Sequence, residues 1–188
     1  MTAVFRLLGC ALLLAPLLCR AGGVLDSSAS YDAGVYSLSI EARIDAPVDK
    51  VYRLITDYDH LHDINPAIRA SRILRTFSPV KHRIRTVTRV CVLFYCRNVT
   101  QIQDMVQDEH HTIEAVVVPR GSDFRRGRGI WHLTGIGDVT LMRFSAELVP
   151  DFYMPALIGP WLIRHEMVNQ ITAIVMIIEA RCQRETSS

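Results

Sequence analysis

The stretch PWLIRHEMVNQITAIVMIIEAR, residues 160–181, decides how the rest of the chain can be arranged. Gly159 precedes it, and proline at a first helical turn loses no hydrogen bond, so the pattern predicts a helix from Pro160 to near Arg181. A helix of about 22 residues is about 33 Å long. One side of it is an apolar stripe made of Ile163, Met167, Ile171, Ile174 and Ile178, flanked by Val168, Val175 and Cys182.

Polar side chains occupy the opposite side of the predicted helix, namely His165, Glu166, Asn169, Gln170 and Thr172. These groups interrupt the apolar run too often for a membrane span. The stripe must therefore be buried against another part of the chain, and that partner has to be a broad apolar surface.

A series of strand-like runs precedes the helix and would supply this surface. Residues 35–44 alternate in polarity and predict a first strand with one buried face. Two short helical segments follow, one ending near Asp57 and one within residues 58–66. Further runs separated by short turns predict antiparallel neighbours, at 68–77, 81–94, 99–106, 112–118, 124–134 and 139–149.

The last of these strands has one apolar and one polar face. Met142, Phe144, Ala146 and Leu148 alternate with Arg143, Ser145 and Glu147. A sheet with an apolar face has to cover it, and only the C-terminal helix is long enough. The elements together predict an α+β fold, in which an antiparallel sheet of about six to seven strands packs on the long helix.

The length of 188 residues suits one domain, which we place at residues 35–183 with a polar tail at 184–188. Residues 24–34 are polar and rich in turn formers, and we expect them to be a leader before the fold. The formal net charge of +2 is close to neutral and favours neither the presence nor the absence of a polyanionic partner. We predict no nucleic-acid partner, and we expect a monomer.

Residues 1–23 have the pattern of a secretory signal peptide. Arg6 is followed by an apolar run at residues 7–19, and small residues then offer a cleavage point after Ala21 or after Gly23. We expect an exported protein, periplasmic or secreted. The alternative is that the segment stays uncleaved and tethers the domain to a membrane.

Export would leave Cys91, Cys96 and Cys182 in a compartment where disulfides persist. A straight strand through Cys91 and Cys96 would hold them too far apart to bridge, because five extended residues span about 17 Å. Either the chain turns at residues 92–95 and the pair forms a disulfide, or both are unpaired small hydrophobes in a strand. Cys182 lies on the apolar stripe and is expected to be inert packing.

At several points the chain resembles the START-like superfamily, whose members include polyketide cyclases and dehydratases, lipid-transfer domains and coenzyme Q-binding proteins. The similar features are the strand at residues 36–44, the segment Ala46-Pro47-Val48-Asp49-Lys50-Val51-Tyr52, the Asp57-Tyr58 pair, Pro66 and the closing helix. The resemblance covers about residues 35–182. It implies a helix-grip fold, in which a curved antiparallel sheet wraps the C-terminal helix and leaves an elongated apolar cavity.

The walls of such a cavity would come from the helix stripe and from inward residues of the sheet. Arg164, near the start of the helix, is a candidate to bind a ligand carboxylate or phosphate, although its side chain could equally extend to the surface. The predicted wall residues are Trp131, Met142, Phe144, Leu148, Ile163, Met167, Ile171, Ile174 and Ile178.

Only one histidine has a position that would suit catalysis. Trp131 and His132 are neighbours on a strand, so they point to opposite faces. We favour an inward Trp131 and an exposed His132; in the alternative, His132 faces the cavity as a general acid or base. His110 and His111 lie at a turn without the spacing of metal ligands, and we predict neither a metal site nor a cofactor.

Two apolar loops are candidates for a gate or for contact with a membrane. Leu93, Phe94 and Tyr95 would form a tip between the cysteines, and Phe152 and Tyr153 precede the long helix. A basic stretch would add attraction to an anionic surface, with Arg120, Arg125, Arg126 and Arg128 around Phe124. The alternative is a strand that continues through the first loop, beside a solvated arginine edge.

The leading hypothesis is an exported, non-catalytic domain that binds a lipid, a quinone or another elongated apolar molecule, with transient contact to a membrane surface. The second hypothesis is a polyketide cyclase or dehydratase that uses His132 or Arg164 in the same cavity. A third is an interaction module whose core is filled. No Ser-His-Asp, Cys-His or glycine-rich phosphate motif is present in the sequence.

Overall fold

A curved sheet of eight antiparallel strands forms the body of the computed structural model, which describes residues 22–92, 95–152 and 159–186. The strand order is β1-β2-β8-β7-β6-β5-β4-β3, so β1 and β3 are the edges. The strands are β1 (Gly23–Asp32), β2 (Val35–Ile44), β3 (Ile68–Ser78), β4 (Lys81–Val92), β5 (Tyr95–Gln107), β6 (Thr112–Val117), β7 (Phe124–Ile136) and β8 (Val139–Pro150).

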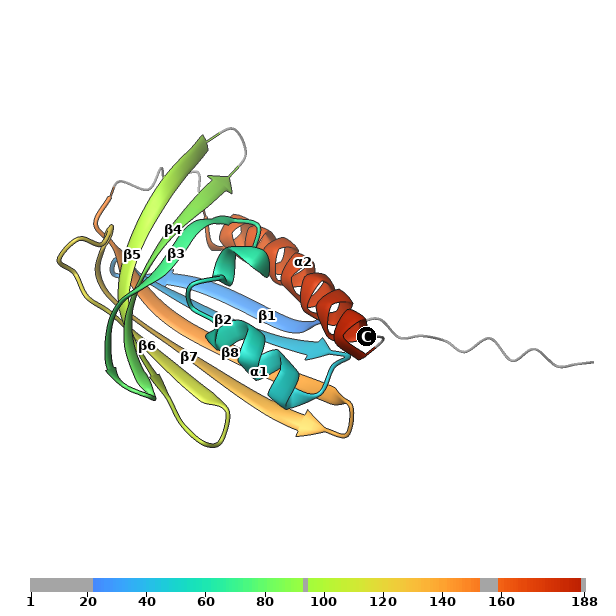
Figure 1. Ribbon diagram of the computed structural model, residues 1–188. Helices are drawn as coiled ribbons and strands as arrows, with labels where there is room; N and C mark the ends of the chain where they lie inside the picture. The colour runs from blue at the N-terminus through green and yellow to red at the C-terminus, as the bar shows by residue number, and fades with distance from the viewer. Residues whose placement is uncertain (1–21, 93–94, 153–158, 187–188) are drawn as a thin grey trace, which may run out of the picture.

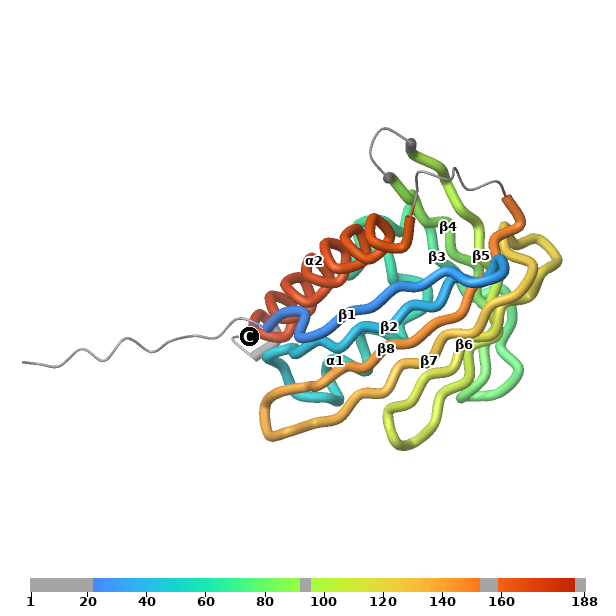
Figure 2. Tube along the Cα trace, turned by 180° about the vertical axis from the view of Figure 1, so that it is seen from behind, coloured from blue at the N-terminus to red at the C-terminus, as the bar shows by residue number. Residues whose placement is uncertain are grey.

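The long helix α2 (Pro160–Thr186) lies along the concave side of this sheet, next to β1 and β2 (Figures 1 and 2). The carbonyl oxygen of Gly159 accepts hydrogen bonds from the N–H groups of Leu162 and Ile163, which starts the helix at the predicted proline. The helix continues past Arg181, where the sequence pattern placed its end. The helix-grip architecture is confirmed.

Two short helices follow β2, as predicted for the segment after the first regular strand. They are α1 (Val48–Thr56) and the 3-10 helix η1 (Leu61–Asp63). Val51 of α1 is fully buried and packs with the far half of α2 and with β2, β7 and β8. This main core contains Ala42, Ile44, Ala46, Val51, Ile64, Leu133, Met142, Val175, Ile178 and Cys182.

The expected polar leader at residues 24–34 is wrong, and the sheet therefore has eight strands instead of the predicted six to seven. These residues form most of β1, which pairs with β2 from Gly23 opposite Arg43 to Asp32 opposite Val35. An edge strand needs only backbone hydrogen bonds to one neighbour, so its side chains carry little apolar signal. Ser27 is the one residue of β1 that is buried.

Side-chain parity is confirmed on β8, where Met142 and Ala146 are buried while Arg143, Ser145 and Glu147 are exposed. The open question about the cysteines is also settled by the strand pairing. The chain turns after Val92, and β4 and β5 form a hairpin that places Cys91 directly opposite Cys96. The two cysteines form a disulfide. Cys182 is buried and lies outside this disulfide.

Candidate ligand cavity

Two adjoining apolar chambers lie between α2 and the sheet. One of about 290 Å³ rests on the first turns of the helix, and we call it the helix-start chamber. The other, of about 270 Å³, rests on the next turns beside the main core, and we call it the core chamber. Leu148 of β8 lines both, so the chambers follow one another along α2.

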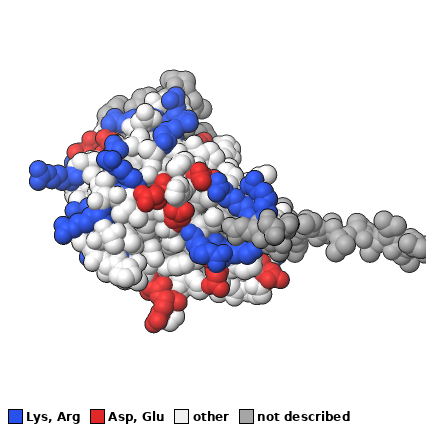
Figure 3. Space-filling model, in the orientation of Figure 1, with Lys and Arg blue, Asp and Glu red and all other residues white. Residues whose placement is uncertain are grey.

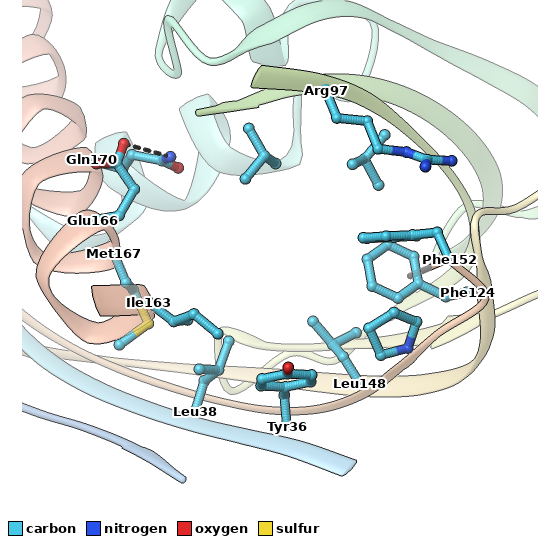
Figure 4. A pocket seen from close by; sticks show the side chains of 13 residues that line it. Tyr36, Leu38, Arg97, Phe124, Leu148, Phe152, Ile163, Glu166, Met167 and Gln170 are labelled. Carbon is cyan, nitrogen blue, oxygen red and sulfur yellow. Dashed lines mark hydrogen bonds between the residues drawn. The ribbon is translucent and has the colours of Figure 1, made fainter. Parts of the chain in front are cut away.

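The helix-start chamber is built from α2 on one side and from β2, β4, β5, β7 and β8 on the other (Figure 4). Phe124 and Phe152 meet edge to face at 6.0 Å between ring centroids and form its aromatic wall. Its lining residues are Tyr36, Leu38, Val90, Arg97, Val99, Phe124, Leu148, Pro150, Phe152, Ile163, Glu166, Met167 and Gln170.

Most polar groups of the helix-start chamber are paired within the protein. Gln170 Nε2 donates to Glu166 Oε1 at 3.2 Å. Arg97 Nη2 donates to Asp123 Oδ1 at 3.4 Å, and its guanidinium lies 4.4 Å from the centroid of the Phe152 ring. Within the described residues, Arg97 Nε is buried without a hydrogen-bond partner. The chamber therefore offers a ligand mainly apolar contact.

Glu166 and Gln170 correct the sequence prediction, which assigned them to the polar side of α2 away from the sheet. Both line the helix-start chamber (Figure 4). The polar and apolar sides of the helix therefore do not separate cleanly in its first turns. Their mutual hydrogen bond lets them face an apolar space at a reduced cost in desolvation.

The core chamber has a wall of large apolar side chains. Trp131 and Phe144 pack with ring centroids 4.6 Å apart and planes inclined by 31°. Met142 lies beside them, and α2 contributes Ile171 and Ile174 to the opposite wall. Every wall residue that the sequence predicts lines one of the two chambers: Ile163 and Met167 the first, Trp131, Met142, Phe144, Ile171, Ile174 and Ile178 the second, and Leu148 both.

The core chamber also contains a polar patch, formed by Thr86, Thr88, Gln101 and Gln103. Thr86 lies opposite Gln101 in the β4–β5 ladder, so the four residues share one area of the sheet. In the part of the chain that the structure describes, none of these side chains makes a hydrogen bond. Thr86 is buried and the other three are half-buried, so these side chains can pair with water or with a ligand.

Tyr58 is another residue that lines the core chamber. Its side chain is 2 % exposed, and its oxygen accepts a hydrogen bond from Gln107 Nε2 at 2.8 Å. Burial raises the pKa of the Tyr58 phenol to about 12, so the group is neutral at physiological pH. Because Gln107 donates to its oxygen, the Tyr58 O–H remains able to act as a hydrogen-bond donor.

The two side chains considered for catalysis or ligand binding lie outside both chambers. His132 is exposed, and its Nδ1 is hydrogen-bonded to Thr112 Oγ1 at 3.2 Å. Arg164 Nε donates to the carbonyl oxygen of Ser27 at 2.8 Å and to its hydroxyl at 3.0 Å. Arg164 therefore ties α2 to the edge strand β1, a partner that was missed because residues 24–34 were not expected to fold.

Of the predicted gate residues, Phe152 lines the helix-start chamber. Tyr95 begins β5, and Leu93, Phe94 and Tyr153 lie outside the described residues. In the basic stretch, Arg125 pairs with Asp151 at 2.9 Å and Arg128 with Glu114 at 2.6 Å. Basic and acidic side chains are interspersed on the face of the molecule in Figure 3, so no single-sign field covers it.

Two further properties concern only residues 22–92, 95–152 and 159–186. No helix among them has the length and apolar character to cross a membrane. No group of three or more His, Cys, Asp or Glu side chains among them is arranged to hold a metal ion.

The polar patch was not predicted, although the sequence contains a signal for it. In β5, Val99, Gln101, Gln103 and Met105 share one parity, and the outer two are buried. Glutamines between two buried residues on the same face must point to the same interior. A polar residue at an inward position is easily taken for a solvent-facing one when only composition is considered.

Comparison with known proteins places the chain in a family. The family described as "Polyketide cyclase / dehydrase and lipid transport" matches residues 36–175. The chain belongs to this family. As a member of the polyketide cyclase/dehydrase and lipid transport family, it is a domain that binds hydrophobic ligands or resembles a polyketide cyclase, and the START-like superfamily expected from the sequence is confirmed. Among curated protein sequences, none matches it.

Solved structures of this superfamily share the fold. The Zhui aromatase/cyclase from Streptomyces sp. R1128 has a TM-score of 0.60 at 15% identity over 81% of this chain and 96% of that one. A START superfamily protein from Mycobacterium smegmatis has a TM-score of 0.61 at 15% identity, covering 79% and 97%. A STAR-related lipid transfer protein from Xanthomonas axonopodis has a TM-score of 0.57 at 15% identity, covering 84% and 98%. At these identities the likeness concerns the fold alone.

Proposed function

We propose that the chain is an exported binding or carrier protein for a lipid, a quinone or another elongated apolar molecule. The observation that carries the proposal is the pair of chambers that follow one another along α2 and share Leu148. A ligand that fills both would bury apolar surface on each side of that residue. Such burial contributes about 25 cal/mol per Å².

The distribution of polar groups gives the ligand an orientation. The polar patch and the Tyr58 hydroxyl offer hydrogen bonds in the core chamber, whereas most polar groups of the helix-start chamber already pair with one another. The oxygen-bearing end of the ligand therefore enters the core chamber, and its apolar tail occupies the helix-start chamber. Ligand oxygen atoms would then give the patch hydrogen-bond partners in place of water.

Two features favour export. The Cys91–Cys96 disulfide is of a kind that persists in oxidising compartments and is rare in the cytosol. Residues 1–23 carry the charge and apolar pattern of a signal peptide. Contact with an anionic membrane during ligand transfer is part of the proposal, with Phe152 and the arginines around Phe124 as candidates.

A volume-filling substitution tests the binding site. Ile171 lines the core chamber, so Ile171→Trp should occupy ligand space and weaken uptake of the fluorescent probe N-phenyl-1-naphthylamine at least about 10-fold. Met176 lies on the solvent side of the same helix and is 61 % exposed, so Met176→Trp is the matched control and should bind like the unmodified protein. Equal binding by both variants would contradict a cavity at this place.

A polyketide cyclase-like enzyme is the second candidate, and one observation favours it. The buried, neutral Tyr58 phenol can donate a hydrogen bond to a substrate carbonyl in the core chamber. Neither His132 nor Arg164 lines a chamber, so neither is retained in this role. Tyr58→Phe should abolish turnover of a polyketide-like substrate while probe uptake persists; turnover that survives the change excludes this role for Tyr58.

A further inference from the structure

Glu179 is a buried carboxylate that none of the functions above uses. It belongs to the last third of α2 and is 8 % exposed. Its Oε1 atom accepts hydrogen bonds from the N–H of Asp45 at 2.7 Å and from the N–H of Gly22 at 3.1 Å. In the described ranges, no Lys, Arg or His side chain forms an ion pair with it. A buried carboxylate held only by neutral N–H groups lacks a cation, which is costly in a protein interior.

Gly22 lies where a processed chain would begin. It adjoins the first residue of β1, and the start of β1 lies beside the C-terminal part of α2 (Figure 2). Cleavage after Ala21 would turn the Gly22 nitrogen into a primary α-amino group. Cleavage after Gly23 would remove that nitrogen from the protein. The sequence permits both cuts, and they have opposite consequences for Glu179.

We propose that the peptide bond between Ala21 and Gly22 is the processing site, and that the new α-ammonium group of Gly22 binds the Glu179 carboxylate. Hydrolysis of this bond gives the hydroxyl of water to the Ala21 carbonyl carbon and a hydrogen to the Gly22 nitrogen. The amine then takes a proton from solvent. The result is a charge-assisted hydrogen bond that joins the beginning of β1 to α2.

Steric fit at residue 22 supports the same arrangement. A Cβ atom placed there would lie 2.5 Å from the carbonyl oxygen of Arg43 and would collide with the Glu179 carboxylate. Only glycine lets the nitrogen of residue 22 lie 3.1 Å from Glu179 Oε1 without a collision at Cβ. Cleavage after the small residue Ala21 would therefore place the new amino group at a position that already donates a hydrogen bond to Glu179.

Mass spectrometry of the exported chain tests the cleavage site. The full sequence is expressed in a bacterium that can export it, and the intact mass of the folded, purified protein is measured. We expect a chain that begins at Gly22. A chain that begins at Val24, or one that retains Met1, overturns the proposal.

A double-mutant comparison tests the ion pair. Mature protein that begins at Gly22 is compared with protein that retains Ala21, each with Glu179 or with Glu179→Gln. Retaining Ala21 should lower the Tm by about 4–8 °C when Glu179 is present, and the difference should largely disappear in the Glu179→Gln background. An equal difference in both backgrounds overturns the ion pair.

This inference rests on export but not on what the cavity binds. Uptake of N-phenyl-1-naphthylamine is measured on the same samples, and it reports only on the chambers. A chain that begins at Gly22 yet takes up no probe would contradict the proposed function alone. A chain with another N-terminus that takes up probe would contradict the processing site alone.

Discussion

The two chambers share one helix and one leucine but differ in how their polar side chains are hydrogen-bonded. In the helix-start chamber, Glu166 pairs with Gln170, and Arg97 pairs with Asp123. In the core chamber, the four side chains of the polar patch make no hydrogen bond within the described chain. Arg97 Nε is the exception in the helix-start chamber, because it is buried without a hydrogen-bond partner in the described residues. The difference teaches that pairing most polar groups within the protein keeps one chamber largely apolar, whereas a cluster of unpaired side chains gives the other chamber several possible partners for a ligand oxygen.

The chambers also differ in their relation to the core. Trp131, Met142 and Ile178 of the core chamber belong to, or pack against, the main core. In the helix-start chamber, Ile163 and Val90 pack only around a small separate cluster at Leu162. Walls of the core chamber should therefore matter for stability as well as for binding.

The largest expected effect is a difference in stability between two aromatic truncations. Trp131→Ala removes a ring that packs on Phe144 and on both larger core clusters, and it should lower the free energy of unfolding by about 3 kcal/mol. Phe124→Ala, in the helix-start chamber, should lower it by about 1 kcal/mol because that ring is only half-buried. Urea denaturation followed by circular dichroism measures both. Equal losses would remove the distinction between the chambers.

The second effect concerns recognition of a ligand oxygen. The double variant Gln101→Leu with Gln103→Leu should reduce the preference for 2-dodecanone over dodecane by about 5- to 30-fold, because up to two hydrogen bonds to the carbonyl are lost. Competition against N-phenyl-1-naphthylamine measures the preference. Gln170→Leu is the control in the helix-start chamber and should change it by less than about 2-fold. A larger effect of the control would reverse the proposed orientation of the ligand.

The third effect tests the hairpin that walls the helix-start chamber. The disulfide closes a short loop between residues 91 and 96, so replacing both cysteines by serine should cost about 2 kcal/mol of stability. The Tm should fall by about 4–8 °C. Reductant should destabilise the unmodified protein to the same extent and leave the double variant unchanged. A Tm that is insensitive to both changes would argue that the bond is absent in solution.

The smallest effect is spectroscopic and compares one tyrosine from each chamber. Burial raises the pKa of Tyr36 in the helix-start chamber and raises that of Tyr58 in the core chamber further, to about 12. An ultraviolet pH titration should show a last phenol that ionises near pH 12 and that is missing from Tyr58→Phe. Because the folded pKa is the higher one, the stabilisation from neutral Tyr58 is complete below the unfolded pKa of about 10 and is lost as the pH rises towards 12. Titration of all phenols together near pH 10 would contradict the burial.

Much of the fold could be predicted from the local periodicity of apolar residues. The stripe from Ile163 to Ile178 and the alternation from Met142 to Leu148 are apolar patterns that only one arrangement can bury, so the helix and the last strand followed from the sequence. The edge strand β1 did not, because its side chains are short and polar and its place is held by backbone pairing with β2.

The site was less accessible to sequence reasoning for a related reason. Apolar wall residues follow from the same periodicities that define the core. The hydrogen bonds of Arg164 to Ser27 were not predicted, because Ser27 lies on the strand that was not expected. Gln101 and Gln103 were missed because a polar residue that faces a cavity has the same composition as one that faces water. Only the pairing of β4 with β5 brings them into one patch with Thr86 and Thr88.

The central claim is that one elongated ligand with an oxygen-bearing end fills both chambers. The most direct measurement is native mass spectrometry of gently purified protein, followed by organic extraction and identification of the released molecule. We expect a single class of apolar molecule to co-purify with the protein and to be released when the protein unfolds. The Ile171→Trp variant should carry much less of it. A protein that is reproducibly empty and takes up no apolar probe would contradict it.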